Sequence, residues 1–312
     1  MFLNEEVIEQ LSGEIDQPES GMSSHWKECL SGFDQKDNGT FAGKGLPEGC
    51  GSTSSRWSIN ELVHWVLQTP YRLQGKRFSK FGKFLKVARK IHKNRNNYMR
   101  LGTLRQVISL SFLEDKVKLS HLNEPVVVIG DGFGLMSSLL LASGCSKKVV
   151  AVNLTQALLI DAAYIMRSIP GEKLALVANE NEYLEALNDS SIKCVLIQAD
   201  NSNLISLANI GIVINICSMQ EMNLQIIADY FYNIRLSKNQ KTLFYCANRL
   251  EKTLPDGAQV NFRDYPWHES DKVLIDELCP WQQKFYRSRP PFYFPYDGPI
   301  QHRLAWVHKM PK

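Results

Sequence analysis

The feature that most constrains this chain is a glycine-rich loop that joins an apolar strand to a helix. Pro125–Ile129 is apolar throughout, Gly130–Gly134 reads Gly-Asp-Gly-Phe-Gly, and Leu135–Ala142 follows as an expected helix. Glycines omit the side chains that would keep a ligand away from the backbone N–H groups and from the start of the helix. The unit therefore predicts an α/β fold with a ligand site at the carboxyl end of this strand.

The spacing of these glycines narrows the ligand. A dinucleotide-binding loop has the pattern GxGxxG, whose third glycine lets helix and strand pack closely around a pyrophosphate. Here Leu135 holds that position, and the third glycine comes earlier, at Gly134. The pattern GxGxG resembles that of the class I methyltransferases, whose loop wraps the amino-acid end of S-adenosylmethionine; the alternative is a tight turn that binds nothing. On this resemblance, the expected cofactor contacts in the loop are Gly130, Asp131, Gly132, Phe133 and Gly134.

Apolar strands alternate with helices beyond the loop, which predicts a mostly parallel sheet covered on both faces. The expected strands are Lys148–Val152, Ile192–Gln198, Ile210–Ile216 and Thr242–Cys246. The expected helices are Ala157–Ser168 and a long one from about Asn223 to Leu236. Leu174–Val177 is apolar but too short to assign.

The pattern after Asn248 is irregular and rich in aromatic residues. Gln259–Tyr265 and Arg303–His308 are expected to form a closing antiparallel strand pair around an inserted helix, Lys272–Leu278. The expected fold class is therefore α/β: a Rossmann-like sheet of the class I methyltransferase type with a helical N-terminal cap. The expected domains are a helical, basic cap or substrate region at 1–118 and a cofactor-binding catalytic domain at 119–312, with an aromatic-rich insertion at about 250–300.

Charge is distributed unevenly along the chain. The net charge is +4, yet no Asp or Glu occurs from Leu62 to Leu113, where twelve Lys and Arg fall. Within this segment, Phe78–Ile91 predicts an amphipathic helix with lysines opposite its apolar side. One interpretation is contact with an anionic surface, membrane or nucleic acid, through residues 72–105. The other is a cap helix that buries its apolar side and leaves its lysines in water.

Several classes of protein are disfavoured by composition. No apolar run is long enough to span a bilayer. The first residues are acidic, unlike a secretory signal. The seven cysteines show neither CxxC pairs nor the spacing of metal ligands. These features predict free thiols in a reducing compartment, a cytoplasmic location and no bound metal.

Polar residues follow the other expected strands, where ligands bind in parallel sheets. Asn153 ends the second strand, where a ribose-binding acid is expected about 20 residues after the loop. Asp200 follows the third strand and could accept a hydrogen bond from the adenine amino group, or simply cap a turn. The remaining expected cofactor contacts are neighbours at strand ends: Leu154, Asn201, Asn215, Cys217 and Ser218.

The chain also resembles the sugar O-methyltransferase family of bacterial surface-polysaccharide clusters. The most specific segment is Asn215–Met222, which reads Asn-Ile-Cys-Ser-Met-Gln-Glu-Met. Further matches lie along most of the chain: Ser24–Trp26, Leu104–Gln106, Asp229–Phe231, Phe244–Arg249, Phe262–Trp267, Asp276–Trp281, Asp297–Pro299 and His302–Leu304. The resemblance implies methyl transfer from S-adenosylmethionine to a sugar hydroxyl. The chain departs from the usual cofactor site because Val128 and Asn153 stand where acids are customary; Asp131 could compensate.

A sugar hydroxyl ionises far above neutral pH, so its methylation requires a base or a metal ion. The candidate bases are Glu221, His268, Asp264 and His302, and no tight cluster of His and Asp indicates a metal. Each has a structural alternative; Glu221, for example, could complement a helix dipole. The expected substrate contacts are Met219, Tyr265, Trp267, Arg303 and Arg105, and the aromatic members could instead be core packing.

Three functions remain open at this point. The first is O-methylation of a nucleotide sugar, a lipid-linked oligosaccharide or a polysaccharide end. The second is methylation of RNA held on the basic segment. The third is a methyltransferase-like binding subunit without catalysis. The segment Asn215–Met222 lacks the Asn/Asp-Pro-Pro-aromatic motif of DNA amino-methylating enzymes, so no DNA partner is expected.

Overall fold

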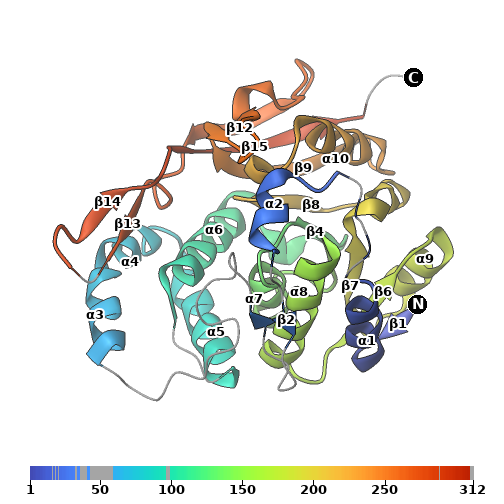
Figure 1. Ribbon diagram of the computed structural model, residues 1–312, viewed down its shortest axis with the longest axis horizontal. Helices are drawn as coiled ribbons and strands as arrows, with labels where there is room; N and C mark the ends of the chain where they lie inside the picture. The colour runs from blue at the N-terminus through green and yellow to red at the C-terminus, as the bar shows by residue number, and fades with distance from the viewer. Residues whose placement is uncertain are drawn as a thin grey trace.

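A computed structural model describes residues 1–15, 17, 19, 21–31, 34–35, 41–42, 59–95, 99–287 and 289–309 (Figure 1). Within this part of the chain, a nine-stranded sheet has the order β1-β6-β7-β5-β4-β8-β9-β15-β12. The six central strands are parallel: β6 (Lys173–Val177), β7 (Ile192–Gln198), β5 (Val149–Asn153), β4 (Val126–Ile129), β8 (Ile212–Ile216) and β9 (Lys241–Arg249). The outer strands are antiparallel to their neighbours: β1 (Phe2–Leu3), β15 (Ile300–His308) and β12 (Lys272–Leu278).

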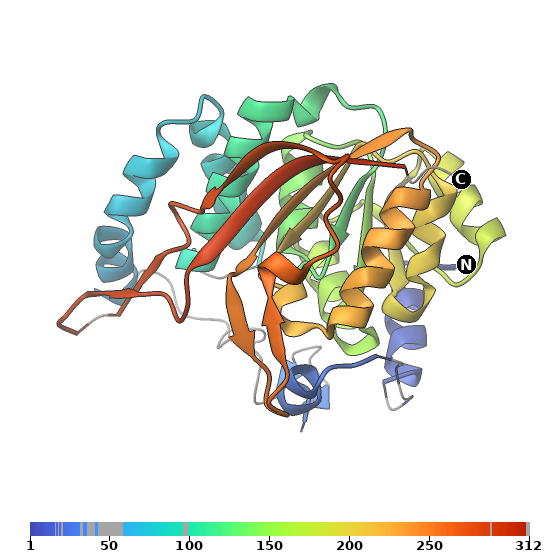
Figure 2. The ribbon, with the colours of Figure 1, turned by 90° about the horizontal axis from the view of Figure 1, so that it is seen from above.

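Helices cover both faces of the sheet (Figures 1 and 2). One face carries α1 (Glu5–Gly13), α5 (Phe81–Asn94), α6 (Leu101–Val117), α7 (Leu135–Ser143) and α8 (Thr155–Ser168). The other carries α9 (Glu180–Asn188), the 3-10 segment η2 (Ala199–Leu207) and α10 (Leu224–Leu236). Because side chains alternate along a strand, Val126 and Val128 enter the first core while Val127 and Ile129 enter the second.

Short elements complete the chain. The helical ones are α2 (Ser24–Cys29), α3 (Ile59–Leu67), α4 (Thr69–Gly75), η1 (Leu119–His121), η3 (Met219–Glu221) and η4 (Phe262–Asp264). In the described residues, three two-stranded sheets pair β2 (Asp34–Gln35) with β3 (Phe41–Ala42), β10 (Glu251–Thr253) with β11 (Gln259–Asn261), and β13 (Lys284–Tyr286) with β14 (Tyr293–Pro295).

The expected fold class is confirmed: the chain has a mostly parallel, Rossmann-like α/β sheet with closing antiparallel strands and a helical N-terminal region. The unassigned segment Leu174–Val177 belongs to β6, which is parallel to β7. The boundary expected at residue 118 does not separate two cores. Helices α5 and α6 pack against α7, and β1 extends the sheet beside β6.

Two expectations about the C-terminal region are wrong. Lys272–Leu278 is the strand β12 rather than a helix, because the free edge of β15 offers hydrogen bonds that local sequence cannot reveal. Gln259–Tyr265 does not pair with Arg303–His308: its first residues form β11, which pairs with β10, and η4 follows. Strand β15 instead pairs with both β9 and β12.

The amphipathic helix is present as α5. Its buried side is lined by Phe81, Phe84, Leu85, Ala88 and Ile91, while its lysines are exposed. The helix therefore packs as a cap helix does, and the exposed lysines leave contact with an anionic surface open. Among the described residues, no helix is both long and apolar enough to cross a membrane.

A buried ion pair ties α10 to the closing strands. The carboxylate of Asp271 lies 2.6 and 2.8 Å from the two terminal nitrogens of Arg235 and accepts hydrogen bonds from the backbone N–H groups of His268 and His308. Burial alone would raise the pKa of Asp271, but these hydrogen bonds and the Arg235 charge hold it below its usual value. The ionised pair therefore stabilises the folded state.

We expect Asp271→Asn to lower the free energy of unfolding by roughly 3 kcal/mol, because it leaves Arg235 buried without a counter-charge. The matched control, Asp297→Asn, breaks an ion pair whose carboxylate side chain is 89% exposed and should cost under about 0.5 kcal/mol. Urea unfolding at pH 7 measures both. Since the pKa of Asp271 is lowered on folding, its contribution is complete above about pH 4 and declines as the pH falls further. Equal losses for the two variants would contradict the assignment.

Candidate functional site

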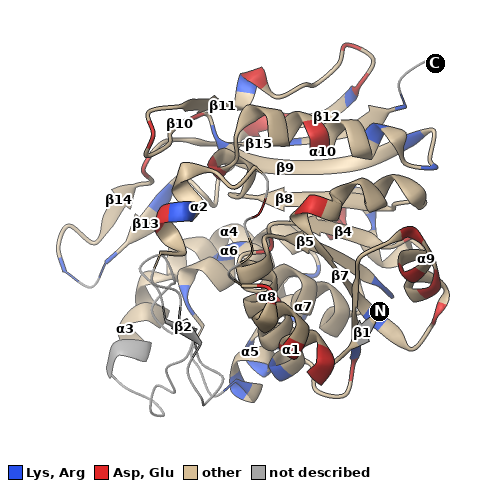
Figure 3. Cartoon of the chain, turned by 45° about the vertical axis from the view of Figure 1, so that its right-hand side comes forward, with Lys and Arg blue, Asp and Glu red and all other residues tan. Residues whose placement is uncertain are grey.

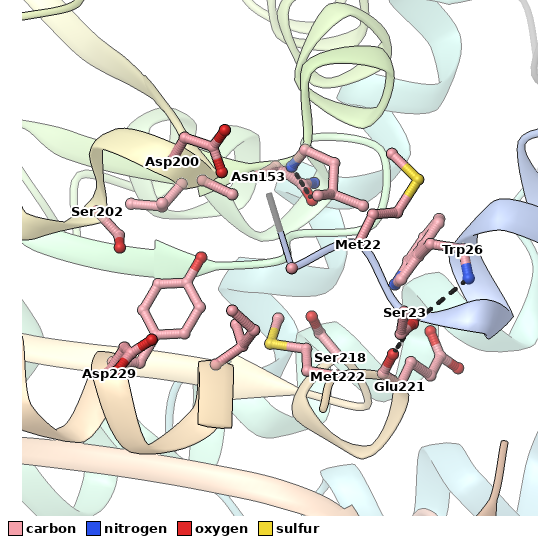
Figure 4. A pocket seen from close by; sticks show the side chains of 16 residues that line it. Met22, Ser23, Trp26, Asn153, Asp200, Ser202, Ser218, Glu221, Met222 and Asp229 are labelled. Atoms are coloured by element: carbon pink, nitrogen blue, oxygen red, sulfur yellow. Dashed lines mark hydrogen bonds between the residues drawn. The ribbon is translucent and has the colours of Figure 1, made fainter. Parts of the chain in front are cut away.

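A pocket lies at the carboxyl ends of β5, β7 and β8, the edge where the glycine loop predicts a ligand. The chain passes from β4 to β5 on one side and returns to β8 on the other, so the pocket stands at the point where the strand order reverses. Asn153, Asp200, Ser218 and Glu221 line it together (Figure 4). Met222 and Tyr230 are among its apolar and aromatic walls.

Residues near the start of the chain line one side of this pocket (Figure 4). Met22, Ser23 and Trp26 line it, and the Ser23 hydroxyl donates a hydrogen bond to the carbonyl oxygen of Glu221. The Glu19 carboxylate accepts hydrogen bonds from the backbone N–H and hydroxyl of Thr155 at 2.7 and 2.9 Å. We call Glu19 and Gly21–Trp26 the strap. The remaining cavity is about 140 Å³, below the roughly 300–1,000 Å³ of small-molecule sites.

Close packing within the protein explains two of the three loop glycines. All three have φ between +59° and +67°. A Cβ on Gly130 would lie 1.8 Å from the Ser218 hydroxyl oxygen, and one on Gly134 would lie 2.6 Å from the carbonyl oxygen of Asp161. A Cβ on Gly132 would meet no atom within 4 Å. Gly132 is therefore the loop position with room for a ligand, while its two neighbours serve the approach of β8 and α8.

Two buried carboxyl groups lie beneath the loop. Asp131 accepts hydrogen bonds from the backbone N–H groups of Met136 and Ser137, both at 2.7 Å, and so occupies the start of α7. Asp161, fully buried on α8, accepts one from the Asn153 amide at 2.9 Å. Asp161 was not among the predicted site residues, although a carboxylate inside the apolar run Leu158–Ile165 is a signal in itself.

Burial and mutual repulsion alter the ionisation of this pair. Burial, and then the charge of Asp131, raise the pKa of Asp161 to about 8, against the hydrogen bond from Asn153 and the N–H groups of Phe133 and Gly134. Burial also raises the pKa of Asp131, while its hydrogen bonds to Ser137 and Met136 oppose the rise. The pair therefore holds a proton at neutral pH, and we place it on Asp161.

The expected cofactor residues do not all face the pocket. The Asn153 amide binds Asp161, and its oxygen accepts from the N–H of Leu154. Asp200 is exposed at the rim, whereas Asn201 follows it in η2 and does not line the cavity. Asn215 is fully buried and donates to the carbonyl oxygen of Ile129 at 2.9 Å, which ties β8 to β4.

Backbone geometry accounts for the next two expected residues. Cys217 has φ +58°, and its N–H donates to the carbonyl oxygen of Ala247 at 2.7 Å, so it turns the chain at the end of β8. Met219, the first residue of η3, has a side chain that is fully buried in the core. The turn presents Ser218 and Glu221 to the pocket, while Met219 makes no contact with it.

Glu221 joins a polar cluster at one side of the pocket. Its carboxylate lies 2.9 Å from the Lys252 ammonium and 3.4 Å from Nε2 of His25. Burial alone would raise the pKa of Glu221, but the His25 hydrogen bond and the Lys252 charge hold it below its usual value. A carboxylate stabilised in this way is a weak base, yet it can orient the His25 imidazole. The sequence analysis included His25 only as part of the resemblance and gave Lys252 no role.

The other three candidate bases lie elsewhere. His268 is exposed and bonds Ser270; it stands by Asp271 near the start of β9, at the opposite edge of the sheet from the pocket. Asp264 is exposed in η4. His302 is fully buried in β15, where Nδ1 lies 3.1 Å from the Tyr245 hydroxyl. Their proposed catalytic roles stay predictions, and the pocket includes none of them.

The remaining expected substrate residues pack within the protein. Tyr265 and Trp267 contact Phe231 edge to face, with ring centroids 6.4 and 4.8 Å away. Arg303 pairs with Asp276 and lies over Trp267. The guanidinium of Arg105 donates to the carbonyl oxygens of Trp281 and Lys284, which fastens α6 to the C-terminal segment. Core packing accounts for the aromatic cluster.

The similarity of this chain to known proteins lies in its fold. Neither the family models nor the curated proteins include a match for this chain. Similar solved structures include an MtNAS variant in complex with S-adenosylmethionine, at 12% identity over 80% of this chain and 77% of that one, with a TM-score of 0.42. A structure concerned with conversion of a disulfide bond into a thioacetal group during echinomycin biosynthesis has 12% identity, covers 65% and 82%, and has a TM-score of 0.40. The glycopeptide N-methyltransferase MtfA with sinefungin has 16% identity, covers 64% and 75%, and has a TM-score of 0.30. At these values, no property of those proteins transfers to this chain.

We expect Asp161→Asn to change how stability depends on pH. Because the pKa of Asp161 is raised to about 8 on folding, the folded state binds more protons than the unfolded state between about pH 4 and 8, and stability falls with rising pH by up to about 1.4 kcal/mol per unit. Asparagine cannot ionise, so the variant should lose much of this slope and be more stable than the native protein at pH 8. Urea unfolding at pH 5, 6.5 and 8 measures the slope, and parallel slopes for both proteins would refute the raised pKa of Asp161.

Proposed function

We propose that this protein is an S-adenosylmethionine-dependent O-methyltransferase that acts on a sugar hydroxyl. The observation that carries the proposal is the Glu221–His25 pair beside a pocket at the carboxyl ends of β5, β7 and β8. The pair supplies a base, and the strand ends supply the edge where α/β sheets bind nucleosides. The resemblance of Asn215–Met222 to sugar O-methyltransferases supports the choice of acceptor.

The adenosine end of the cofactor enters the pocket when the strap opens, and closure of the strap then returns His25 to Glu221. Asp200 is an exposed acceptor for an amino group, and Leu154, Met222 and Tyr230 provide a wall against which a base can pack. Gly132 leaves the loop open on the same edge. When bound, S-adenosylmethionine supplies an electrophilic methyl group. The Asn153 amide is turned inward and donates to Asp161. Asp200 is therefore the main polar residue for recognition of the adenosine end of the cofactor.

The chain's own contribution to the reaction is proton removal. A sugar hydroxyl is a poor nucleophile until a base accepts its proton. Glu221 stays ionised against Lys252 and holds the His25 imidazole through Nε2. This arrangement leaves Nδ1 of His25 as the proton acceptor, with Glu221 as the group that orients and stabilises the resulting imidazolium. Trp26 and Ser23, from the same strap, exclude water from the site.

A second candidate is a methyltransferase-like binding protein without catalysis. The observation that favours it is that Asp131 and Asp161 already satisfy N–H groups of the loop and of the start of α7. An anionic ligand group would meet carboxyl groups there rather than free donors. This candidate predicts one of two outcomes. Either the protein binds the cofactor without transferring its methyl group, or it does not bind the cofactor at all.

Binding of S-adenosylmethionine is the first test. Titration calorimetry should give a dissociation constant below about 1 mM, and Asp200→Ala should weaken binding about five-fold or more through loss of one hydrogen bond to a charged group. Asp264→Ala, which removes an exposed carboxylate outside the pocket, should change the constant less than about two-fold. Absence of binding at millimolar ligand would rule out the proposed methyltransferase and leave the non-catalytic binding protein.

Methyl transfer tests the catalytic pair. With labelled cofactor, we expect transfer to nucleotide sugars or lipid-linked glycans and none to RNA. His25→Gln should reduce kcat by about 100-fold or more while cofactor affinity is retained, as expected for loss of a general base. Glu221→Gln should reduce kcat less and shift the acidic limb of its pH profile, because it only orients His25. The control His121→Gln alters an exposed histidine in η1 and should leave kcat unchanged. Full activity of His25→Gln with an inactive Glu221→Gln would make Glu221 the base instead.

A further inference from the structure

One end of the molecule carries exposed apolar side chains. We define the apolar end face by six residues of α3, α4 and the hairpin β13–β14: Leu62, Trp65, Val66, Leu73, Phe292 and Tyr293. Their side chains are between 40% and 60% exposed. Scattered apolar residues at a surface are ordinary, but a group of this size on adjoining elements marks an interaction site.

The face is held in place by hydrogen bonds between segments more than 200 residues apart. The Tyr293 hydroxyl donates to the carbonyl oxygen of Leu67 at 2.9 Å, and the Tyr286 hydroxyl lies 2.9 Å from Nδ1 of His64. The Tyr71 hydroxyl donates to the carbonyl oxygen of Lys284 at 2.7 Å. Figures 1 and 2 show the hairpin projecting beside α3 and α4 at this end. These hydrogen bonds thus fix α3, α4 and the hairpin, which carry the exposed side chains, relative to one another.

Both segments that build this end lack acidic residues. No Asp or Glu occurs from Leu62 to Leu113 or from Leu278 to Tyr296. Every Lys and Arg from Lys76 to Lys93 is exposed, and Lys284, Arg287 and Arg289 add exposed cations on the hairpin. Figure 3 shows Lys and Arg on α5, whereas α1 and α9 carry acids. The apolar end face therefore adjoins a strongly cationic surface.

From this combination we propose that the apolar end face and α5 dock the protein peripherally on an anionic lipid bilayer. Aromatic and aliphatic side chains enter the boundary between headgroups and acyl chains, while adjacent Lys and Arg attract the anionic headgroups. A nucleic acid would use the cations, but it gains little from the aliphatic Leu62, Val66 and Leu73. The described residues include no helix able to span a membrane, so contact through this surface is interfacial.

The docking surface lies toward the edge of the sheet that holds the pocket. The hairpin β13–β14 leads into β15 at Ile300, which pairs with Arg249 at the carboxyl end of β9. The pocket stands at the carboxyl ends of the neighbouring parallel strands. Figure 2 shows the hairpin and α2 along this same edge. Docking would therefore hold the pocket edge beside the bilayer. The docking proposal itself does not depend on the proposed function.

Sedimentation with vesicles tests the proposal on the full chain. The probes are vesicles of phosphatidylglycerol with phosphatidylcholine and vesicles of phosphatidylcholine alone, each at low and high salt. We expect binding to the anionic vesicles at least about ten-fold stronger than to the neutral ones, weakened by salt. Trp65→Gln with Leu73→Gln should reduce it about ten-fold. Lys83→Gln, Lys86→Gln and Lys90→Gln together should reduce it similarly and flatten its salt dependence.

The matched control replaces Tyr232 and Leu184 by Gln. Tyr232 is 61% exposed on α10 and Leu184 is 37% exposed on α9, so both are exposed apolar residues outside the apolar end face. This variant should bind vesicles as the native protein does. Thermal melting verifies that all variants are folded. The proposal is overturned by no vesicle binding, by equal binding to neutral vesicles, or by equal losses in the control. Competition by a mixed-sequence RNA that displaces the protein from vesicles at stoichiometric amounts would assign the basic surface to nucleic acid instead.

Discussion

The pocket depends on two buried carboxyl groups beneath the glycine loop, and burial together with the neighbouring charge raises the pKa of one of them, Asp161. Asp131 fills the start of α7, and Asp161 reaches from α8 to the Asn153 amide at the end of β5. Removing two carboxyl groups from water is costly, and retaining a proton avoids placing two charges side by side. The loop, α7, α8 and β5 are fixed relative to one another by these contacts. The positions of the loop and of these strand ends are therefore set by contacts within the protein.

The central strands could be predicted because each is buried on both faces and so reads as a continuous apolar run. Strands β4, β5, β7 and β8 are of this kind, and the glycine loop marked the first of them. Strand β12 could not be predicted in the same way. Its residues are mostly exposed, and its conformation depends on β15, which comes more than 20 residues later. The pairing of β11 with β10 likewise depends on a neighbour rather than on its own sequence.

The site was predictable to the extent that it follows the strand ends. Asn153, Asp200 and the neighbours Ser218 and Glu221 come from three parts of the sequence. Each part lies at or just after the end of a parallel strand, so the sheet brings them to one pocket. The strap follows no strand, so its place over the pocket depends on tertiary contacts, and Asp161 was marked only by its position inside an apolar run. His268 and His302 were also candidates, but one lies at the far edge of the sheet and the other inside the core, so the pocket includes neither. Sequence resemblance indicates which segments belong together, while register decides which side chains face the pocket.

Strand β12 also bears on how the molecule behaves at high concentration. As the last strand of its sheet, it presents unpaired backbone groups that another chain could extend. Its pairing with β15 is irregular between Val273 and Ile275, and charged residues Lys272 and Glu277 flank that break. A kinked, charged edge is a poor template for a further strand, since a second chain would have to desolvate those charges and match the irregular spacing. An edge strand that local sequence does not reveal thus contains features that oppose polymerisation.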